Sequence, residues 1–247
     1  MKFSIITATF NSAATIRDTL ESVKNQSYHN IEHLIIDGVS KDETLSICNE
    51  YDHITRIHSE KDNGIYDAMN KGISLASGDV IGILNSDDFY THPHVIEQVA
   101  HAFLTGADAV YGDLQYVDSN NTNKIIRTWH SGKFSPRDFY FGWMPPHPTF
   151  FVKKEVYEKI GNFNTSLRSA ADYEFMLRAL CKHRLRAAYI PEVLVRMRAG
   201  GMSNASLQNR LNANREDRLA WKINGLKPYF FTLYLKPARK IFQYIIK

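Results

Sequence analysis

Short apolar runs alternate with stretches of helical periodicity along the first 130 residues of the chain. The apolar runs are rich in β-branched residues and end in small polar or acidic residues, which is typical of buried strands. They predict strands at 3–8, 33–36, 53–58, 79–84, 108–117 and 124–129. Between them, apolar residues recur three or four positions apart and predict helices at 64–76 and 93–104. Two further helices are predicted to begin at a Ser12 cap and at a capping box at 40–43.

This alternation predicts an α/β fold, in which helices flank both faces of a mostly parallel central sheet. The rhythm breaks near residue 130, and segment 132–150 is rich in aromatic residues, Gly and Pro. We interpret this segment as a functional loop. Two helices, a β-rich stretch and a polar helix are then predicted, at 153–160, 172–183, 186–198 and 206–222.

The positive charge of the chain is concentrated in its C-terminal tail. The net charge is +4, and the tail from Lys222 to Lys247 has six Lys or Arg and no Asp or Glu. The rest of the chain therefore has 24 basic and 26 acidic residues. A nucleic-acid-binding body would carry its own basic face, so we exclude that class of protein. The two cysteines, Cys48 and Cys181, are far apart and form no CxxC pattern, so no zinc site is predicted.

Residues 228–247 mix aromatic and aliphatic side chains with four cations. This composition fits an amphipathic segment on an anionic membrane surface, or a helix that packs on the body or on a partner subunit. No run approaches the roughly 18 apolar residues that span a bilayer. The first seven residues are too short and too soon polar for a signal peptide. We expect a cytoplasmic protein, and peripheral contact with the cytoplasmic face of the membrane stays open.

Two short acidic segments carry the candidate chemistry: Asn85-Ser86-Asp87-Asp88 follows a predicted buried strand, and Ala171-Asp172-Tyr173-Glu174 opens a predicted helix. Adjacent carboxylates at the end of a buried strand are costly unless another charge offsets theirs. A divalent cation with a phosphate ligand would do so, because hard cations prefer carboxylate oxygens. A separate Asp can act as a general base. These groups suit the transfer of a group from a nucleoside diphosphate.

Polar residues also end the first two predicted strands, Thr9 and Asn11 after one and Asp37 after the other. In open α/β sheets, ligands bind beyond the carboxyl ends of the strands. A strand-end Asp can accept a hydrogen bond from the imide N–H of a base such as uracil or thymine. The chain has no GxGxxG and no GxxxxGK[ST], so a dinucleotide site or a phosphate loop of those types is not expected.

Four segments, in this order, resemble glycosyltransferase family 2: SIITATFN at 4–11, IDGVSKDET at 36–44, DNGIYDAMNKG at 62–72 and NSDD at 85–88. The resemblance covers roughly residues 2–200. It implies a GT-A fold, an inverting mechanism and a nucleoside-diphosphate-sugar donor, most often a UDP-sugar, with GDP- and dTDP-sugars open. It also implies a catalytic domain at 1–205, with a nucleotide-binding half (1–118) and an acceptor-side half (119–205). Residues 206–247 are expected to form a helical, basic and aromatic extension.

The resemblance also implies roles for single residues. The nucleotide-sugar site would be formed by Thr9, Asn11, Asp37, Asp67, Asn70 and Asp87. Asp88 would bind Mn²⁺ or Mg²⁺. The sequence departs from the commoner family pattern at Met69, where an Arg is usual. Asp172 would be the catalytic base, with Ala171 in place of the family's Glu and Glu174 as a fallback.

Three residues are candidates for the acceptor or diphosphate side. His147 would contact the acceptor, the diphosphate or the metal, and Trp143, like Phe141, would stack on a sugar face. Arg198, or Arg196 in the same segment, would close on the diphosphate as a mobile lid. Structural roles for all three stay open.

The function predicted from the sequence is a metal-dependent, inverting transfer of one sugar to a hydroxyl. The acceptor is expected to be a saccharide or a lipid-linked molecule in cell-surface polysaccharide synthesis. Two alternatives are a nucleotidyltransferase, which would need a Gly-rich basic loop after the first strand, and a non-catalytic nucleotide-sugar-binding subunit of a membrane complex. The oligomeric state stays open.

Overall fold

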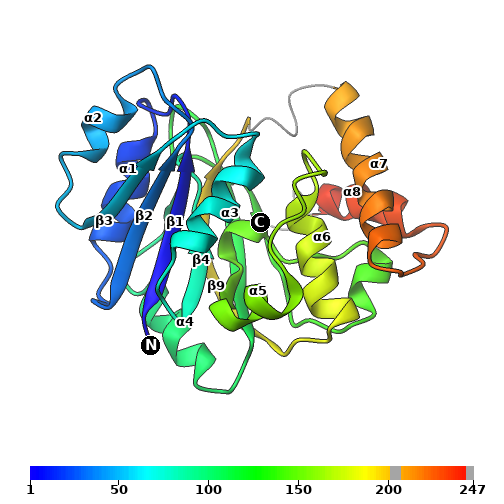
Figure 1. Ribbon diagram of the computed structural model, residues 1–247. Coiled ribbons are helices and arrows are strands. Elements are labelled where there is room, and N and C mark those ends of the chain that lie inside the picture. Colours follow the sequence, from blue (N-terminus) through cyan, green and yellow to red (C-terminus); the bar gives the residue numbers. More distant parts are fainter. Residues whose placement is uncertain (201–206, 243–247) are drawn as a thin grey trace.

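The computed structural model describes residues 1–200 and 207–242. Within them, nine strands form one sheet in the order β3-β2-β1-β4-β8-β6-β9-β5, with β7 paired to β6 (Figure 1). The strands are β1 (Phe3–Thr9), β2 (Ile31–Asp37), β3 (Ile54–Ser59), β4 (Val80–Ile83), β5 (Asp88–Tyr90), β6 (Ala109–Val117), β7 (Ile125–Trp129), β8 (Phe151–Lys153) and β9 (Ala187–Arg198). The predicted α/β class is confirmed.

Helices cover both faces of the sheet. The α-helices are α1 (Ile16–Lys24), α2 (Thr44–Cys48), α3 (Ile65–Leu75), α4 (Val95–Phe103), α5 (Lys154–Ile160), α6 (Ala171–Leu177), α7 (Leu207–Ile223) and α8 (Thr232–Phe242). Two 3₁₀ turns, η1 (Asp138–Phe141) and η2 (His147–Thr149), and a π-helical turn, η3 (Arg178–Lys182), complete the elements. None of the helices in the described ranges is both long and apolar enough to cross a membrane.

Strands β3, β2, β1 and β4 run parallel, so their carboxyl ends meet at one edge of the sheet. In this register Thr9 lies beside Asp37, and Ile6 lies beside Ile83 just before the acidic segment. The rest of the sheet is mixed, because β8 is antiparallel to β4 and β6, and β5 is antiparallel to β9. The predicted convergence of polar strand ends is therefore confirmed for the first half of the chain.

The two faces of β2 explain why both sides of the sheet are covered. Ile35 packs against α1 and Ile36 packs against α3, because successive strand residues point to opposite faces. Helix α3 lies close to the sheet at Gly72. A Cβ there would lie 2.4 Å from Cγ2 of Ile6, so only glycine permits this approach.

Two predicted helix starts are wrong. Helix α1 begins at Ile16, and the Ser12 hydroxyl contacts the Ser86 hydroxyl at 2.8 Å instead of capping a helix. The predicted capping box at 40–43 does not form, because α2 begins at Thr44 and the Ser40 hydroxyl binds the Asp37 carboxylate. In both cases a hydroxyl that is suited to capping contacts the neighbouring loop of the sheet edge.

The described part of the C-terminal extension packs on the body. Trp221 of α7 is fully buried and its indole N–H donates to the Tyr173 hydroxyl of α6 at 2.9 Å. On α8, Thr232 donates to the Tyr140 carbonyl at 2.6 Å, and Leu233 belongs to the same core cluster as Trp221. The alternative of a helix that packs on the body is confirmed, and residues 243–247 of the predicted tail lie outside the described residues.

This shared core makes a stability prediction. Trp221→Ala should lower the free energy of unfolding by about 3–5 kcal/mol, because it empties a fully buried site between α7 and α6. Urea denaturation followed by circular dichroism should show one cooperative transition in both proteins. The control is Leu219→Ala on the exposed side of the same helix, which should change the free energy by less than about 0.5 kcal/mol. An early, separate transition of the extension would contradict a shared core.

Candidate functional site

The loop after β2 encloses the Asp37 carboxylate. This carboxylate is fully buried and accepts hydrogen bonds from the backbone N–H groups of Val39 and Ser40, both at 3.0 Å, and from the Ser59 hydroxyl at 2.6 Å. Asp37 therefore lies at the predicted sheet edge but is engaged by its own loop. Direct contact with a base, as expected from the sequence, would require residues 37–40 to move.

The end of β1 presents an exposed aromatic ring. Phe10 is 60% exposed, and its ring edge lies 3.4 Å from the position of a Cβ at Gly38. The neighbouring Thr9 hydroxyl is buried and has no hydrogen-bond partner among the described residues. Asn11 adopts a positive φ of 49°, and its side-chain oxygen accepts from the Lys41 N–H at 2.8 Å. Phe10 was missed from the sequence, although its place between two polar strand-end residues was a signal.

The two carboxylates after β4 differ in burial. Asp88 is fully buried at the start of β5, and one of its oxygens has no partner in the described residues. Burial, with the nearby charge of Asp87, raises the pKa of Asp88 well above its usual range. Asp87 is partly exposed, and burial raises its pKa against the opposing charge of Arg198. A nearby positive charge is therefore needed for both carboxyl groups to be ionised, and without it the pair favours holding a proton.

Arg198 lies beside this acidic pair at the end of β9. Its guanidinium donates to the Asp87 carbonyl at 2.7 Å and forms an ion pair with Asp18 of α1. The side chain is buried, so the prediction of a mobile lid at this residue is not supported. Arg198 instead anchors the acidic loop through the Asp87 carbonyl, and its charge acts on both carboxylates.

These oxygen atoms fit a divalent cation in part. The Asp87 and Asp88 carboxylates and the buried, unpartnered side-chain oxygen of Asn85 are the hard ligands that Mn²⁺ and Mg²⁺ prefer. In residues 1–200 and 207–242, no group of three or more His, Cys, Asp or Glu is placed to hold a metal ion. An ion here would take its remaining ligands from phosphate oxygens and water.

Asp172 lies in the first turn of α6 and contacts two other candidate groups. It accepts a hydrogen bond from the Tyr66 hydroxyl at 2.9 Å, and its other oxygen is 3.9 Å from Nδ1 of His147. The Asp172 side chain is 20% exposed. Its carboxylate is therefore oriented by Tyr66 and remains reachable from solvent. Tyr66, within the segment 62–72, was missed from the sequence.

Burial sets the protonation of both neighbours. Burial, with the charge of Asp172, raises the pKa of Tyr66 well above its usual range, so this hydroxyl stays a donor. Burial lowers the pKa of His147 against the attraction of Asp172 and Asp87, so the imidazole is neutral near pH 7. Its Nε2 is buried without a partner in the described part of the chain. His147 and Asp172 line one small pocket, whose other lining residues are Ile83, Phe150, Tyr157, Phe163, Phe175 and Met176.

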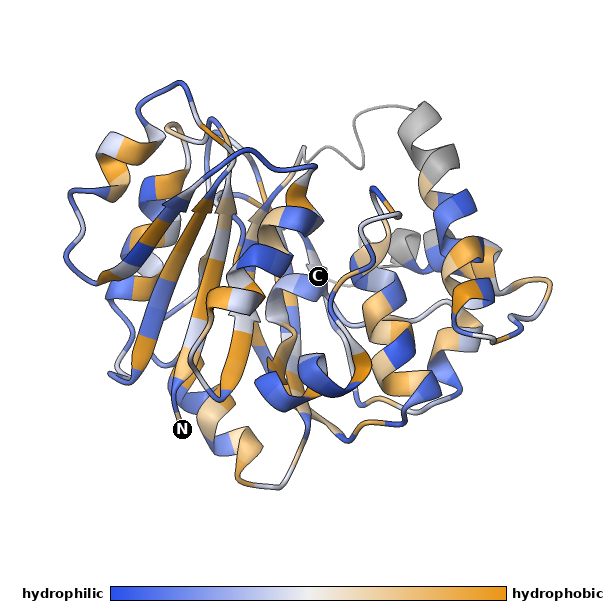
Figure 2. Cartoon of the chain, viewed as in Figure 1, coloured by the Kyte–Doolittle hydropathy of each residue, from blue (hydrophilic) through white to orange (hydrophobic). Residues whose placement is uncertain are grey.

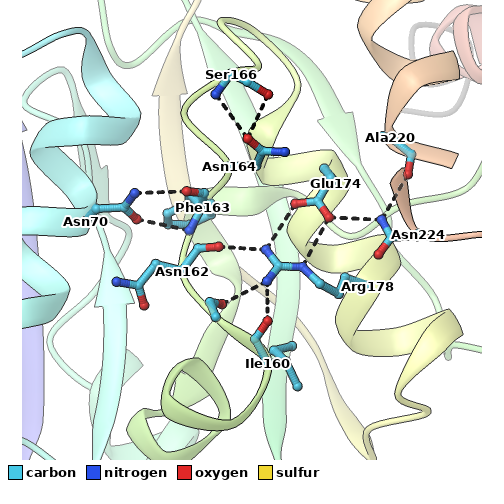
Figure 3. Close-up of polar contacts among 11 residues, drawn as sticks. Asn70, Ile160, Asn162, Phe163, Asn164, Ser166, Glu174, Arg178, Ala220 and Asn224 are labelled. Carbon is cyan, nitrogen blue, oxygen red and sulfur yellow. Dashed lines mark hydrogen bonds and ion pairs between the residues drawn. The ribbon is translucent and has the colours of Figure 1, made fainter. Parts of the chain in front are cut away.

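Glu174, the fallback base, has a structural role (Figure 3). It is buried, its two carboxylate oxygens accept from Arg178 at 3.1 and 3.0 Å, and Asn224 donates to it at 2.9 Å. Arg178 also donates to the carbonyl groups of Ile160 and Asn162. A carboxylate so enclosed cannot reach a substrate, so Asp172 is the accessible acid of this helix.

Asn70 also has a structural role. Its side-chain N–H donates to the Phe163 carbonyl at 2.9 Å, and its oxygen accepts from the Phe163 N–H at 3.0 Å (Figure 3). From the other side, Glu216 of α7 accepts from the N–H groups of Arg168 and Ser169. The predicted contact of Asn70 with the donor is replaced by a clamp on the loop that leads to Asp172.

Two further candidates are occupied by local contacts. Asp67 lies in the first turn of α3. Its carboxylate accepts from the Asn63 N–H at 2.9 Å and lies 3.5 Å from the Lys71 ammonium. Trp143 is buried, donates to the Ser131 carbonyl at 2.7 Å and stacks on Phe134 at 5.1 Å between ring centroids. Stacking of Trp143 on a sugar is therefore excluded by its burial in the core.

The sequence of this chain is similar to those of known glycosyltransferases. The sequence matches the family described as glycosyl transferase family 2 over residues 4–168. It is 32% identical over 210 residues to a PGL/p-HBAD biosynthesis glycosyltransferase of Mycobacterium bovis, which covers 82% of this chain and 79% of that protein. It is 36% identical over 179 residues to an uncharacterized glycosyltransferase of Mycobacterium tuberculosis, with coverage of 71% and 68%.

Two solved structures have a similar fold. TarS from S. aureus in complex with UDP-GlcNAc superposes with a TM-score of 0.72 at 19% identity, over 91% of this chain and 65% of that chain. The present chain thus spans slightly less than two thirds of the TarS chain. The mannosyltransferase PcManGT from Pyrobaculum calidifontis, in complex with GDP-Man and Mn²⁺, has a TM-score of 0.66 at 19% identity, over 95% and 68% of the two chains.

Proposed function

The chain belongs to glycosyl transferase family 2 and has the GT-A fold, and from this premise we propose that it transfers one sugar from a nucleoside-diphosphate-sugar to an acceptor hydroxyl. The observation that carries the proposal is the pocket in which Asp172 and His147 meet Ile83, the end of the strand that leads to Asp87 and Asp88. The proposed base thereby lies in a cavity that reaches the end of the strand before the acidic segment. The proposed acceptor is a saccharide or lipid-linked molecule in cell-surface polysaccharide synthesis.

In the proposed reaction, Asp172 accepts the proton of the acceptor hydroxyl as its oxygen attacks the anomeric carbon. The bond from that carbon to the diphosphate oxygen breaks on the opposite face, so a single displacement inverts the configuration. The hydrogen bond from Tyr66 directs one Asp172 oxygen and leaves the other for the acceptor. Neutral His147 cannot protonate Asp172 and can itself accept or donate a hydrogen bond.

The donor diphosphate would lie at Asp87 and Asp88. A bound Mn²⁺ or Mg²⁺ would neutralise charge that develops on the leaving diphosphate. The sequence-based assignment gave the metal to Asp88 and placed Asp87 in the nucleotide-sugar site. The difference in burial favours Asp87 as the carboxylate that reaches an incoming ligand, with Asp88 behind it.

The donor is proposed to be a UDP-sugar, which the likeness to TarS in complex with UDP-GlcNAc supports. The likeness to PcManGT in complex with GDP-Man keeps a GDP-sugar as the alternative. Calorimetric titration with UDP, GDP and dTDP, each with and without Mn²⁺, tests the proposal. Metal-dependent binding of UDP is the expected result. The absence of binding to all three diphosphates would overturn the donor site.

Phe10→Ala should weaken binding of the preferred nucleoside diphosphate by roughly tenfold, because the exposed ring at the end of β1 is placed to stack on the base. The same calorimetric titration measures the loss. Leu104→Ala removes an exposed apolar side chain at the end of α4 and should leave the affinity unchanged. Equal affinities for wild type and Phe10→Ala would exclude Phe10 from the base site.

A further inference from the structure

The loop between α7 and α8 and the start of α8 expose aromatic side chains, some of which contact Phe141 of the body. Phe230 is 89% exposed and Tyr234 of α8 is 63% exposed. Ring contacts join Phe141 to Tyr229 at 6.1 Å and to Phe231 at 5.9 Å, and join Phe230 to Phe231 at 5.1 Å. We call these five rings the aromatic surface. The loop that carries three of them projects away from the central sheet (Figure 1).

The packing of the extension does not account for this exposure. The inner side of α7 and α8 is already filled, since Trp221 and Leu233 are buried against the body. The last turns of α7 contain Leu219 and Ile223, each 41% exposed, and Figure 2 shows apolar residues both at this end of α7 and along the loop that follows it. Contiguous exposed apolar residues of this kind mark interaction sites in soluble proteins.

The rim of the aromatic surface is cationic. The sequence from 218 to 247 contains no Asp or Glu. Arg218, Lys222 and Lys227 are exposed and form no ion pair within the described residues. The preceding acid, Asp217, is buried and binds the Lys236 ammonium at 2.7 Å. Within residues 218–242, the exposed charge beside the rings is therefore of one sign.

We propose that the aromatic surface and its cationic rim dock this protein on an anionic lipid bilayer. Phe and Tyr rings enter the boundary between headgroups and acyl chains, and Lys and Arg bind lipid phosphates. A second copy of this chain is a poorer occupant, because it would bring the same positive rim into contact and add repulsion. A bilayer supplies both the apolar layer and the negative charge that this surface lacks.

The test is co-sedimentation of the full chain with vesicles of phosphatidylcholine alone or enriched in phosphatidylglycerol, without nucleotide. Binding should be at least about tenfold stronger to the phosphatidylglycerol vesicles and should weaken as salt is raised. Phe230→Ser, and separately the pair Lys222→Glu and Lys227→Glu, should each reduce that binding by about tenfold or more. The matched controls, Leu104→Ser and the pair Lys159→Glu and Lys182→Glu, change exposed residues elsewhere and should bind like wild type.

Unchanged circular dichroism and melting temperature will show that the variants fold. We expect this result because the substituted side chains are exposed. No vesicle binding, equal binding to both lipid compositions, or equal losses in the controls would overturn the proposal. A dimer that dissociates in Phe230→Ser, without vesicle binding, would also overturn it and assign the surface to self-association. Because no nucleotide is present, this result is independent of the proposed transferase activity.

Discussion

Asp172→Asn is expected to lower turnover of the preferred nucleotide-sugar by roughly 10²–10⁴-fold and to leave nucleoside diphosphate binding unchanged. Asn keeps the shape of the side chain but cannot accept the acceptor proton. In the wild type, the Tyr66 hydroxyl donates to Asp172 at 2.9 Å. The fold should be preserved in the variant, because the Asn side chain still offers an oxygen to this hydroxyl. Steady-state release of the diphosphate measures turnover, and calorimetry measures binding.

Two variants separate the base from its surroundings. Tyr66→Phe keeps the carboxylate and removes one hydrogen bond, so turnover should fall only by about tenfold. Glu174→Gln, two residues further along α6, should instead lower the melting temperature, because it breaks the buried pair with Arg178. If Asp172→Asn turns over like wild type, Asp172 is not the base. A wild-type chain that binds nucleotide-sugar but never turns it over would favour the non-catalytic subunit.

Asp87→Asn should weaken Mn²⁺-dependent binding of the nucleoside diphosphate by more than about 100-fold. Loss of a residue that contacts only a metal ligand, and not the metal, typically costs about 10–100-fold. The partly exposed Asp87 carboxylate would contact the ion directly, and its negative charge is the part that Asn lacks. Titrating Mn²⁺ at a fixed nucleotide concentration, with binding followed by calorimetry, measures the change. Binding without metal should be weak in both proteins.

Asp88→Asn should behave differently from Asp87→Asn. Asp88 is fully buried, and burial raises its pKa well above its usual range, so ionisation of this group opposes folding. A neutral Asn should raise the metal-free melting temperature and weaken metal-dependent binding less than Asp87→Asn does. Loss of metal-dependent binding in Asp88→Asn alone would restore the original assignment of the metal to Asp88.

The sequence located the sheet edge well. Parallel strands end on the same side, so polar residues after two consecutive strands had to meet, and Thr9 does pair with Asp37 in register. The acidic segment after β4 lies at the same edge, because β4 pairs with β1. The three-residue strands β5 and β8 were not predicted, since they are too short to show a period of two.

The errors at single side chains arose from burial and pairing that local patterns do not encode. Trp143 and Arg198 looked available for a substrate, yet the first is enclosed by other rings and the second is tied to Asp18 and Asp87. Phe10 and Tyr66 were passed over, although Phe10 is exposed at the end of β1 and Tyr66 donates a hydrogen bond to Asp172.

By itself the sequence determined the α/β class, the family and the acidic residues on which catalysis is proposed to rest. These follow from periodicity and short motifs, which depend on neighbours within a few positions. Only the tertiary structure decided which of Asp172 and Glu174 is accessible, since Tyr66 and Arg178 contact them from different sides. The contacts that decide the site join residues 106 and 111 positions apart, Tyr66 with Asp172 and Arg198 with Asp87. Such pairs form only when the fold brings distant helix starts and strand ends together.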